Sequence, residues 1–327
     1  MTEDELVRKI QRAFPSTRNG ALGLGIGDDA ALFTPRHGYD VVLTCDWFLE
    51  GSHFLRDKHP PDSVGWKCLA RAVSDIAAMG GVPRCFLLSL ALPGSSTGRW
   101  LGEFLRGLRW ASKALSCELA GGDTTRREEI LVSLSVAGEV RKGQAIRRAG
   151  ARPGDQLFVT GTLGEAELGL RMLRQEKGLA RPRNAALRKH LYPVVRLAVG
   201  RWLAEKKLAS AMMDLSDGLS TDLGRLCKAS GVGARIMAGS LPVTPLVERA
   251  EGTELALHGG DDYELMFAVR PNDAGKIPSK YRGVALAQIG EIRAGQEILV
   301  EQDSKLRRLL SGGWDPFGGE SKEKSRR

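Results

Sequence analysis

The chain has 327 residues, of which 42% are hydrophobic and 27% are charged. This globular composition excludes a largely disordered chain, and the length predicts about two domains. The 48 basic and 39 acidic residues give a net charge of +9, which predicts a solvated basic surface or the attraction of an anionic small molecule. Nucleic-acid binding is the alternative interpretation of the same charge.

No segment of the sequence indicates a membrane or secreted protein. No apolar run reaches the ~18 residues that a transmembrane helix requires, and the N-terminus MTEDELVRKI lacks the basic and apolar regions of a secretory signal. The five cysteines are scattered, and none forms a C-x-x-C pair. This pattern argues against a zinc ribbon or a disulfide scaffold and favours a reducing, cytoplasmic location without a membrane partner.

The N-terminal half predicts helices alternating with apolar strands. Thr2 to Glu5 fits a capping box, and apolar residues follow it at helical spacing. Asp62 or Ser63 is suited to cap a helix that ends at Met79, where two glycines and a proline follow. Apolar runs and a longer amphipathic stretch give the remaining elements. Strands are expected at 39–45, 85–93 and 130–140, and a further helix at 97–117.

A basic stretch rich in glycine and proline, RRAGARPGD (147–155), separates two halves of the chain. We place a domain boundary near 148–153, which gives an N-terminal domain (1–150), a C-terminal domain (151–317) and a disordered tail (318–327). Beyond the boundary we expect strands at 156–161, 211–214, 234–238, 263–269 and 284–292, and helices at 164–176, 185–206 and 218–229. Because helices and strands alternate without a regular βαβ repeat, the expected fold class is α+β.

Aspartates recur after glycine or serine, or at the ends of apolar strands. They are Asp28, Asp29, Asp46, Asp75, Asp123, Asp214, Asp217, Asp261 and Asp262, with Glu264 close behind. Carboxylates gathered in one place repel one another unless cations neutralise them. Hard oxygen ligands beside small residues suit Mg²⁺, which binds a few carboxylates together with substrate phosphates. The pattern therefore predicts a site for Mg²⁺ and a polyphosphate.

Each acidic motif also has a structural interpretation. Asp75 shares an apolar helix face with Arg71 and is spaced for an i, i+4 ion pair with it. Asp217 precedes a helical stretch and is suited to cap it, and GDD and GGDT read alone as turns. The chain has no P-loop motif and no protein-kinase motif set, and GLGIG (23–27) is followed by GDD where a dinucleotide-binding fold would start a helix.

Seven blocks occur in order along the chain: GIGDDAA, TCDWFLEGSHF, SDIAAMGGVP, AGGDTT, RAGARPGD, DLSDGL and GGDDYEL. Together they resemble the thiamine-monophosphate kinase family, over residues 1–317. That family is grouped with aminoimidazole ribonucleotide synthetase, selenophosphate synthetase and a hydrogenase maturation factor. The resemblance implies a two-domain aminoimidazole ribonucleotide synthetase-like fold, in which the N-terminal sheet domain forms a homodimer and the C-terminal domain is α+β.

The resemblance also implies a phosphotransferase with a phosphate group as acceptor, which uses ATP and several Mg²⁺ ions to convert thiamine monophosphate to thiamine diphosphate. By motif position, the implied metal ligands are Asp28, Thr44, Asp46, Asp75, Asp123, Asp214 and Asp217, of which Asp46, Asp75, Asp123 and Asp217 are the implied catalytic residues. The implied ATP contacts are Gly122, Arg148 and Ser216, and the implied contacts with the thiamine phosphate are His53, Glu264 and Trp314. Two positions depart from the family pattern: Cys45 stands where relatives often have Thr, and Ala72 where they often have Asn.

The residues themselves agree with this chemistry. Phosphoryl transfer between two anions depends mostly on positioning and on charge neutralisation. The acceptor phosphate is already ionised near neutral pH, since the second pKa of a phosphate monoester is about 6. No strong base is needed, which fits the absence of a Ser-His-Asp or Cys-His nucleophile pattern. We therefore expect direct in-line transfer without a phosphoenzyme.

Other activities are disfavoured by particular segments. Selenophosphate synthetase would need a reactive Cys in the glycine loop, where 15–27 contains none, and the maturation factor would end in Cys, whereas this chain ends KSRR. An aminoimidazole ribonucleotide synthetase-type ligase or cyclase is the main enzymatic alternative, and the E-G-x-H-F block (50–54) and the terminal GWDPF argue against it. A basic nucleic-acid-binding protein would need aromatics interleaved with its basic residues, and aromatics are only 6% of the chain. We therefore expect small-molecule partners and no nucleic acid.

Overall fold

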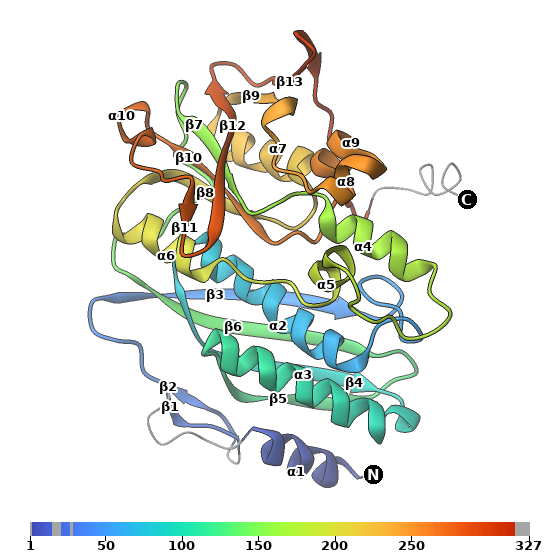
Figure 1. The fold of residues 1–327 in the computed structure, drawn as a ribbon. Coiled ribbons are helices and arrows are strands. Elements are labelled where there is room, and N and C mark those ends of the chain that lie inside the picture. Colours follow the sequence, from blue (N-terminus) through green and yellow to red (C-terminus); the bar gives the residue numbers. More distant parts are fainter. Residues whose placement is uncertain (1, 15–20, 27–28, 318–327) are drawn as a thin grey trace.

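The computed structural model describes residues 2–14, 21–26 and 29–317. It has two halves, each built on its own β-sheet and packed with helices (Figure 1). The N-terminal half contains a four-stranded sheet in the order β3-β6-β4-β5. Its strands are β3 (Tyr39–Leu49), β4 (Val82–Leu92), β5 (Glu118–Arg126) and β6 (Leu131–Arg141). Strands β4 and β5 run parallel, and the other pairs are antiparallel.

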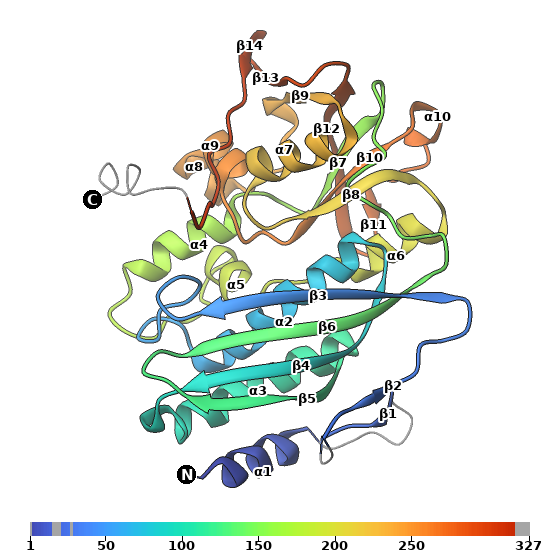
Figure 2. The ribbon, with the colours of Figure 1, turned by 180° about the vertical axis from the view of Figure 1, so that it is seen from behind.

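One face of this sheet is covered and the other is open. Helices α2 (Pro61–Ala78) and α3 (Arg99–Leu115) share an apolar core with strand residues such as Phe48, Phe86 and Val132. Because side chains alternate along a strand, the neighbours of these core residues within each strand point to the opposite face. Figure 2, which views the molecule from behind, shows no described element of the chain laid over that face.

The first helix, α1 (Glu3–Ala13), begins with the predicted capping box, which is confirmed. The backbone N–H of Thr2 donates to Glu5, and that of Glu5 donates to the Thr2 hydroxyl. Buried Leu6 and Ile10 attach the helix to the N-terminal core. Two short strands follow and pair with each other: β1 (Leu22–Leu24) and β2 (Leu32–Phe33).

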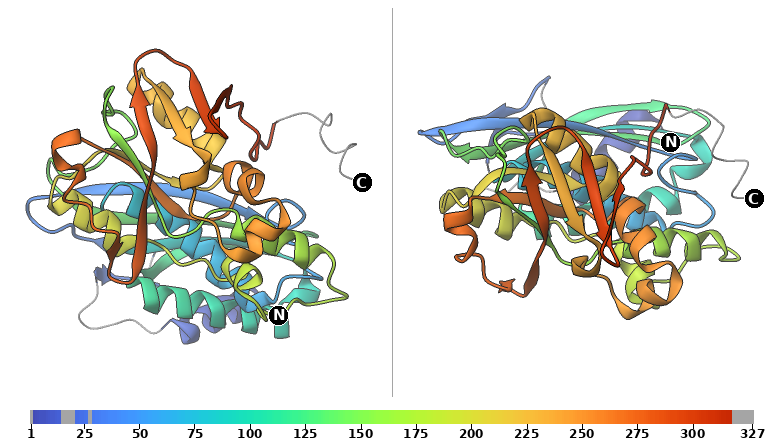
Figure 3. Two further views of the ribbon diagram at one scale, coloured as in Figure 1. Left: turned by 45° about the horizontal axis from the view of Figure 1, so that its top comes forward. Right: turned by 90° about the horizontal axis from the view of Figure 1, so that it is seen from above.

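The C-terminal half contains a mixed eight-stranded sheet. Seven strands follow the order β14-β13-β9-β12-β7-β10-β8, and β11 pairs with β12 beside this path. The strands are β7 (Gln156–Thr160), β8 (Ala209–Leu215), β9 (Gly233–Met237), β10 (Glu264–Val269), β11 (Lys280–Tyr281), β12 (Val284–Arg293), β13 (Ile298–Gln302) and β14 (Lys305–Arg308). Figure 3 shows this half lying on the helix-covered side of the N-terminal sheet.

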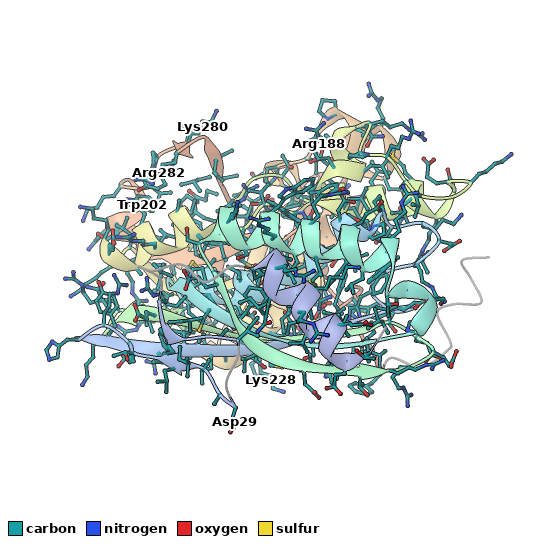
Figure 4. The ribbon with its side chains drawn as sticks, turned by 90° about the horizontal axis from the view of Figure 1, so that it is seen from below. Asp29, Arg188, Trp202, Lys228, Lys280 and Arg282 are labelled. Atoms are coloured by element: carbon teal, nitrogen blue, oxygen red, sulfur yellow. The ribbon has the colours of Figure 1, made fainter. Side chains whose placement is uncertain are left out.

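Both faces of the C-terminal sheet are buried. On β10, Phe267 enters a core shared with α6 (Leu197–Glu205), whereas its neighbour Met266 enters the core beneath α7 (Leu219–Ser230). Trp202 of α6 stacks on Tyr281 with ring centroids 4.4 Å apart, and Figure 4 shows Trp202 beside the Lys280–Arg282 segment. The remaining helices are α4 (Glu165–Arg174), α5 (Ala185–Leu191), α8 (Pro245–Ala250), α9 (Gly252–His258) and α10 (Pro271–Ala274), with 3₁₀ turns at Gly94–Ser96 and Ala238–Ser240.

Helix α2 is shared between the two halves. Most of its turns pack on the N-terminal sheet and α3, whereas Ala77 and Ala78 at its end belong to the core beneath the C-terminal sheet. The contact with α6 is close, because a Cβ added at Gly200 would lie 2.1 Å from the carbonyl oxygen of Ala77. A helix buried on nearly all sides presents side chains to every neighbour. Polar residues on α2 therefore face both halves.

The α+β fold class is confirmed, and three local predictions are wrong. Neither Asp62 nor Ser63 caps α2, because the helix begins at Pro61 and its N-cap is Pro60. The helix predicted at 185–206 is two helices, α5 and α6, because Pro193 has no backbone N–H with which to continue α5. The GGDT motif is no turn but part of β5, a strand that its glycines conceal. The pattern also did not predict β1, β2, β11, β13 or β14.

Two further expectations concern the C-terminal tail and membrane-spanning helices. The predicted tail at 318–327 lies outside the described residues. Across the described ranges, no helix combines the length and the apolar character needed to cross a membrane.

Gly107 on α3 marks the closest approach of that helix to α2. A Cβ at this position would lie 1.8 Å from the carbonyl oxygen of Asp62, so the two helices would have to separate. We expect Gly107→Ala to lower the free energy of unfolding by about 1–3 kcal/mol, the usual cost of overpacking. Urea unfolding followed by circular dichroism measures this change.

Gly102→Ala, on the same helix, is the matched control. Gly102 is exposed, and nothing lies within 4 Å of the position that its Cβ would take. Alanine should therefore raise stability by up to about 1 kcal/mol through its better helix propensity. Equal effects of the two substitutions would contradict the close packing of α2 on α3.

Candidate functional site

Three polar residues of the N-terminal half meet between β3 and α2. Thr44 and Asp46 lie on the helix-covered face of β3, in the alternation that also buries Phe48. Asp75 lies in the last turns of α2. The Thr44 hydroxyl donates a hydrogen bond to Oδ2 of Asp75 at 2.5 Å. The packing of α2 on β3 thus brings two of the predicted aspartates and the predicted threonine together.

The C-terminal half contributes Asp214 and Asp217. Asp214 lies near the end of β8, is only 4% exposed, and accepts a 2.7 Å hydrogen bond from the Ser74 hydroxyl. Ser74 and Asp75 are neighbours on α2, so one turn of that helix contacts groups from both halves. Asp217 follows in the loop before α7, close enough to Asp46 to raise the pKa of that carboxyl.

We call the four aspartates Asp46, Asp75, Asp214 and Asp217 the carboxylate group. Burial is the main cause of the raised pKa of Asp214, about 7, and the charge of Asp75 raises it further. Burial also raises the pKa of Asp46; Arg71 opposes the rise, and Asp75 and Asp217 add to it. Mutual repulsion of partly buried carboxylates is what a bound cation relieves, and hard oxygen donors suit Mg²⁺.

The carboxylate group is open rather than a closed metal cage. Among residues 2–14, 21–26 and 29–317, no three His, Cys, Asp or Glu side chains are arranged so that they could hold an ion by themselves. Mg²⁺ usually keeps several waters and shares its protein carboxylates with phosphate oxygens. The arrangement therefore suits a metal ion that is bound together with a phosphate.

The sequence pattern did not single out Arg71 as part of the site. Its guanidinium lies 3.8 Å from Oδ1 of Asp46, with Cζ 5.5 Å from the centroid of the Phe48 ring. The i, i+4 ion pair considered for Arg71 and Asp75 is not among those of the described residues, and Asp75 is hydrogen-bonded by Thr44 instead. The only signal in the sequence was a basic residue on the same helix face as Asp75.

Asp261 and Asp262 bind groups of the protein. Nζ of Lys67, a residue of α2 that is 1% exposed, lies 2.7 Å from Oδ2 of Asp261, and the Tyr263 hydroxyl donates to Oδ1 at 2.7 Å. Burial would raise the pKa of Asp261, but the charge of Lys67 holds it below the ordinary value. Asp262 accepts the N–H of Gly164 at 2.6 Å, at the start of α4. The first of these contacts ties the two halves together.

Glu264, predicted to contact the thiamine phosphate, is fully buried among partners from its own half. Arg196 donates to both of its oxygens at 2.6 Å, Thr160 donates at 2.6 Å, and Lys189 lies at 3.2 Å. The side chains of Arg196 and Lys189 remain 18% and 13% exposed. Glu264 thus orients two cations that the sequence pattern did not identify, because they lie far from the acidic motif along the chain.

His53 lies near Arg71, and Trp314 lies beside Asp217. Nδ1 of His53 accepts the N–H of Leu49 at 3.1 Å, which assigns the ring proton to Nε2. Burial and the charge of Arg71 lower the pKa of His53 to about 4, so the ring is neutral and presents an N–H donor. The backbone N–H of Trp314 donates to the carbonyl of Asp217 at 3.0 Å, and its indole is half exposed.

Ser216 and Asp217 form the turn between β8 and α7. Their backbone N–H groups both donate to Asp222 at 3.0 Å. Asp217 does not take the N-cap role considered for it: Gly218 is the N-cap, and the Asp217 carboxylate pairs with Arg225 at 2.5 Å. The turn holds Asp217 at the edge of the carboxylate group.

A single chain does not bring Gly122 and Asp123 to the carboxylate group. The sheet register aligns Gly122 with Asp46 across two intervening strands, so β3 and β5 are about 14 Å apart at this level. Asp123 is exposed and in register with Ser89, which lies on the open face of the sheet. Asp46 lies on the covered face. The two aspartates are therefore separated by both distance and the sheet itself.

Two other positions singled out in the sequence, Arg148 and Cys45, also lie apart from the carboxylate group. Arg148 is exposed in the linker, where its carbonyl accepts a 2.9 Å hydrogen bond from Ser230. Cys45 is on the open face of the sheet, 3.5 Å from the Ser135 hydroxyl, so its side chain points away from the covered face and from a metal bound there. Asp28 lies outside the described residues.

A cavity of about 570 Å³ lies at the other end of β8 from Asp214. Its lining includes Arg147, Arg152, Lys207 and Arg270 and no carboxylate. It is separate from the carboxylate group and contributes none of the predicted residues.

Comparison with known proteins places the chain in a family. Family models for the N-terminal and C-terminal domains of AIR synthase related proteins match residues 27–140 and 152–301. The thiamine-monophosphate kinase of Bacillus subtilis (strain 168) is 33% identical over 97% of this chain and 100% of that protein.

Solved structures agree with the sequence comparison. The thiamine-monophosphate kinase from Stenotrophomonas maltophilia K279a is 35% identical, with a TM-score of 0.82 over 93% of this chain and 98% of that one. AaThiL, complexed with AMPPCP and TMP, is 33% identical, with a TM-score of 0.77 over 96% and 97% of the two chains. On this similarity over nearly its whole length, the chain belongs to the thiamine-monophosphate kinase family.

Proposed function

We propose that this chain transfers the γ-phosphate of ATP to thiamine monophosphate, forming thiamine diphosphate and ADP. The observation that carries the proposal is the convergence of Asp46, Asp75, Asp214 and Asp217 from two halves of the chain. AaThiL binds AMPPCP and TMP. Two phosphate-bearing substrates that meet in one site need strong charge neutralisation.

Several Mg²⁺ ions fit the donor atoms of the carboxylate group. Asp46, Asp75, Asp214 and Asp217 would hold them, with Thr44 as a further oxygen donor. Bound Mg²⁺ would neutralise phosphate oxygens and align the two phosphates. Asp28 is added to these ligands on its motif alone, and Asp123 by way of the dimer described below.

The transfer is proposed to be direct and in line. An oxygen of the acceptor phosphate attacks the γ-phosphorus, the bond to the β–γ bridging oxygen breaks, and ADP leaves with the electron pair. Because the acceptor is already ionised near neutral pH, the protein needs no strong base.

The groups around the carboxylates are suited to hold the acceptor. Neutral His53 offers an N–H to a phosphate oxygen. Arg196 and Lys189 supply partly exposed positive charge, with Glu264 as the positioning residue behind them. The half-exposed indole of Trp314, anchored beside the carboxylate group, is suited to a cationic thiazolium ring.

A second copy of the chain is proposed to complete the site. Figure 2 shows the open face of the N-terminal sheet. On this face Leu43, Trp47 and Leu87 are 75%, 57% and 45% exposed. Several large apolar side chains exposed on one open sheet face favour an interface. Asp123 lies on this face, away from Asp46 of its own chain. Because β3 is an edge strand of its sheet, a homodimer formed through this face is proposed to bring Asp123 of each chain past that edge to the carboxylate group of the other.

ATP is proposed to contact Gly122, Arg148 and Ser216. A Cβ at Gly122 would lie 1.8 Å from the carbonyl oxygen of Leu88, so only glycine fits there and its backbone stays open to a ligand. The exposed guanidinium of Arg148 is suited to bidentate binding of a phosphate. Ser216 adjoins Asp217 in the turn after β8.

The organisation of the chain and its location complete the proposal. We assign ATP and Mg²⁺ binding and dimerisation to residues 1–150, and the α+β C-terminal domain to 151–317. The five unpaired cysteines support a reducing, cytoplasmic location.

The reaction itself is the first test. With ATP, Mg²⁺ and thiamine monophosphate, the purified chain should form thiamine diphosphate, measured by chromatography of the products. Asp46→Asn and Asp217→Asn should each lower kcat by about 10²-fold or more, because each removes a charge that positions metal and phosphate. Asp57→Asn changes an exposed loop carboxylate and should leave kcat unchanged. Parental turnover in both site variants would refute the metal assignment, and absence of product from the parent would refute the function.

Mixing two inactive variants tests whether the dimer shares its sites. If Asp123 of one chain serves the carboxylates of the other, an Asp46→Asn/Asp123→Asn heterodimer has one intact site and one doubly altered site. An equimolar mixture that exchanges freely should then recover about a quarter of the parental activity, since half of the dimers are mixed. If both residues serve the same chain, no intact site forms and the mixture stays inactive.

The raised pKa of Asp214 predicts a pH-dependent stability. The ordinary pKa of an aspartate is 3.8, whereas that of Asp214 in the folded chain is about 7. Between these values the folded state holds one more proton than the unfolded state, so the stability of the metal-free protein falls as the pH rises. Asp214→Asn should remove most of this fall, measured by urea unfolding with a chelator at about pH 5 and pH 8. Identical pH profiles for the two proteins would contradict the assignment.

Stabilisation of the same protein by Mg²⁺ should increase as the pH rises. Metal binding requires the ionised carboxylate, so Mg²⁺ should raise the Tm more at pH 8 than at pH 5. The difference should shrink in Asp214→Asn. A pH-independent effect of Mg²⁺ in the parent would count against Asp214 as a ligand.

A further inference from the structure

Arg71 is a cation at the carboxylate group, and one of its buried N–H donors has no partner among the described residues. Its side chain is 16% exposed, and Nε is buried without a partner in the described structure. A guanidinium carries five N–H donors. Burying such donors without acceptors is unfavourable. Arg84 also has an unpaired buried Nε but lies near Glu139, whereas Arg71 lies at the carboxylate group, where a phosphate is proposed to bind and would supply acceptor oxygens.

Phe48 and Asp46 lie beside Arg71 without forming a short hydrogen bond to it. Its position on α2 directs it towards β3, where Phe48 lies beneath the guanidinium, Cζ to ring centroid 5.5 Å. Among the described residues Arg71 forms one ion-pair contact, to Asp46, and its length of 3.8 Å exceeds that of a hydrogen bond. Burial would lower the pKa of Arg71, but Tyr263 and nearby aspartates raise it, so the group stays charged. A positive charge is thus held beside the carboxylates without a short ion pair to Asp46.

Other arginines of this chain show what a purely structural ion pair looks like. Arg196 places two nitrogens on the oxygens of Glu264 at 2.6 Å. Arg225 bridges Asp217 and Asp222 at 2.5 and 2.7 Å. Arg71 makes no comparable contact, although Asp46 is beside it. A role limited to neutralising Asp46 does not account for this geometry.

We propose that Arg71 is a further catalytic residue, which binds the anionic oxygens of the transferring γ-phosphate when ATP enters the carboxylate group. The inference rests on the proposed function and adds a direct protein contact to it. A guanidinium forms paired hydrogen bonds with phosphate oxygens and stays protonated throughout. Charge spread over the equatorial oxygens in the transition state strengthens this contact.

The test compares Arg71→Ala and Arg71→Lys with Arg84→Ala. We expect Arg71→Ala to lower kcat by about 10²-fold or more with a smaller change in KM, and added guanidinium ion to restore at least tenfold. Arg84→Ala is the matched control: its Nε is also buried without a partner, but it lies on β4 near Glu139, away from the carboxylate group. Its kcat should match that of the parent.

A different result is expected if Arg71 only neutralises the charge of Asp46. Removal of the positive charge would then tighten Mg²⁺ binding and leave kcat at saturating Mg²⁺ unchanged. A kcat for Arg71→Ala within threefold of the parent would therefore overturn the proposal. If Arg71→Ala does not fold, Arg71→Lys decides, because lysine keeps the charge but not the paired donors: a loss of tenfold or more supports the contact, and parental kcat overturns it.

Binding of AMPPCP separates this inference from the proposed function. Calorimetry with AMPPCP and Mg²⁺, without an acceptor, should show at least tenfold weaker binding to Arg71→Ala than to the parent and to Arg84→Ala. If the parent binds AMPPCP but does not phosphorylate thiamine monophosphate, the proposed acceptor is wrong and the contact of Arg71 is still tested. Equal affinities in all three proteins would overturn the contact even if the reaction is the one proposed.

Discussion

The packing of α2 against both halves of the chain is the constraint on which the site depends. This helix is buried on nearly every side, and its neighbouring residues Ser74 and Asp75 contact Asp214 of one half and Thr44 of the other. Close contacts that leave no room for a Cβ fix it against α3 and α6. Packed helices do not slide freely past one another. The carboxylates of the two halves are therefore held in one place before any ligand binds.

Helix α2 also supplies positive charge to the site. Lys67 is paired with Asp261 and ties the halves together, whereas Arg71 lies 3.8 Å from Asp46 and its buried Nε has no partner among the described residues. Lys67 thus has a structural role, and Arg71 remains available to a ligand. Burial raises the pKa of Asp46 and of Asp214, and the charges of neighbouring aspartates raise both further. Divalent cations and the phosphates that accompany them complete such a site.

The acidic motifs of this chain serve two different purposes. Asp261, Asp262 and Glu264 lie opposite lysine, arginine or backbone N–H groups of the protein and are satisfied by them. The members of the carboxylate group, although hydrogen-bonded or paired elsewhere, lie close enough together to raise the pKa of Asp46 and Asp214 beyond the effect of burial. The motifs look alike in the sequence, because an aspartate next to glycine is the same in both settings. The difference lies in what the fold places across from each side chain.

The sequence by itself determined the α+β class, most helices and strands, and the aspartates that converge. These depend on local periodicity, caps and turn residues, which neighbouring residues encode. Only the tertiary structure decided that Arg71 faces Asp46, that Glu264 is enclosed by Arg196 and Lys189, and that Asp123 lies on the opposite face of the sheet from Asp46. Strand register and helix packing set these relations between distant segments, and no local pattern records them.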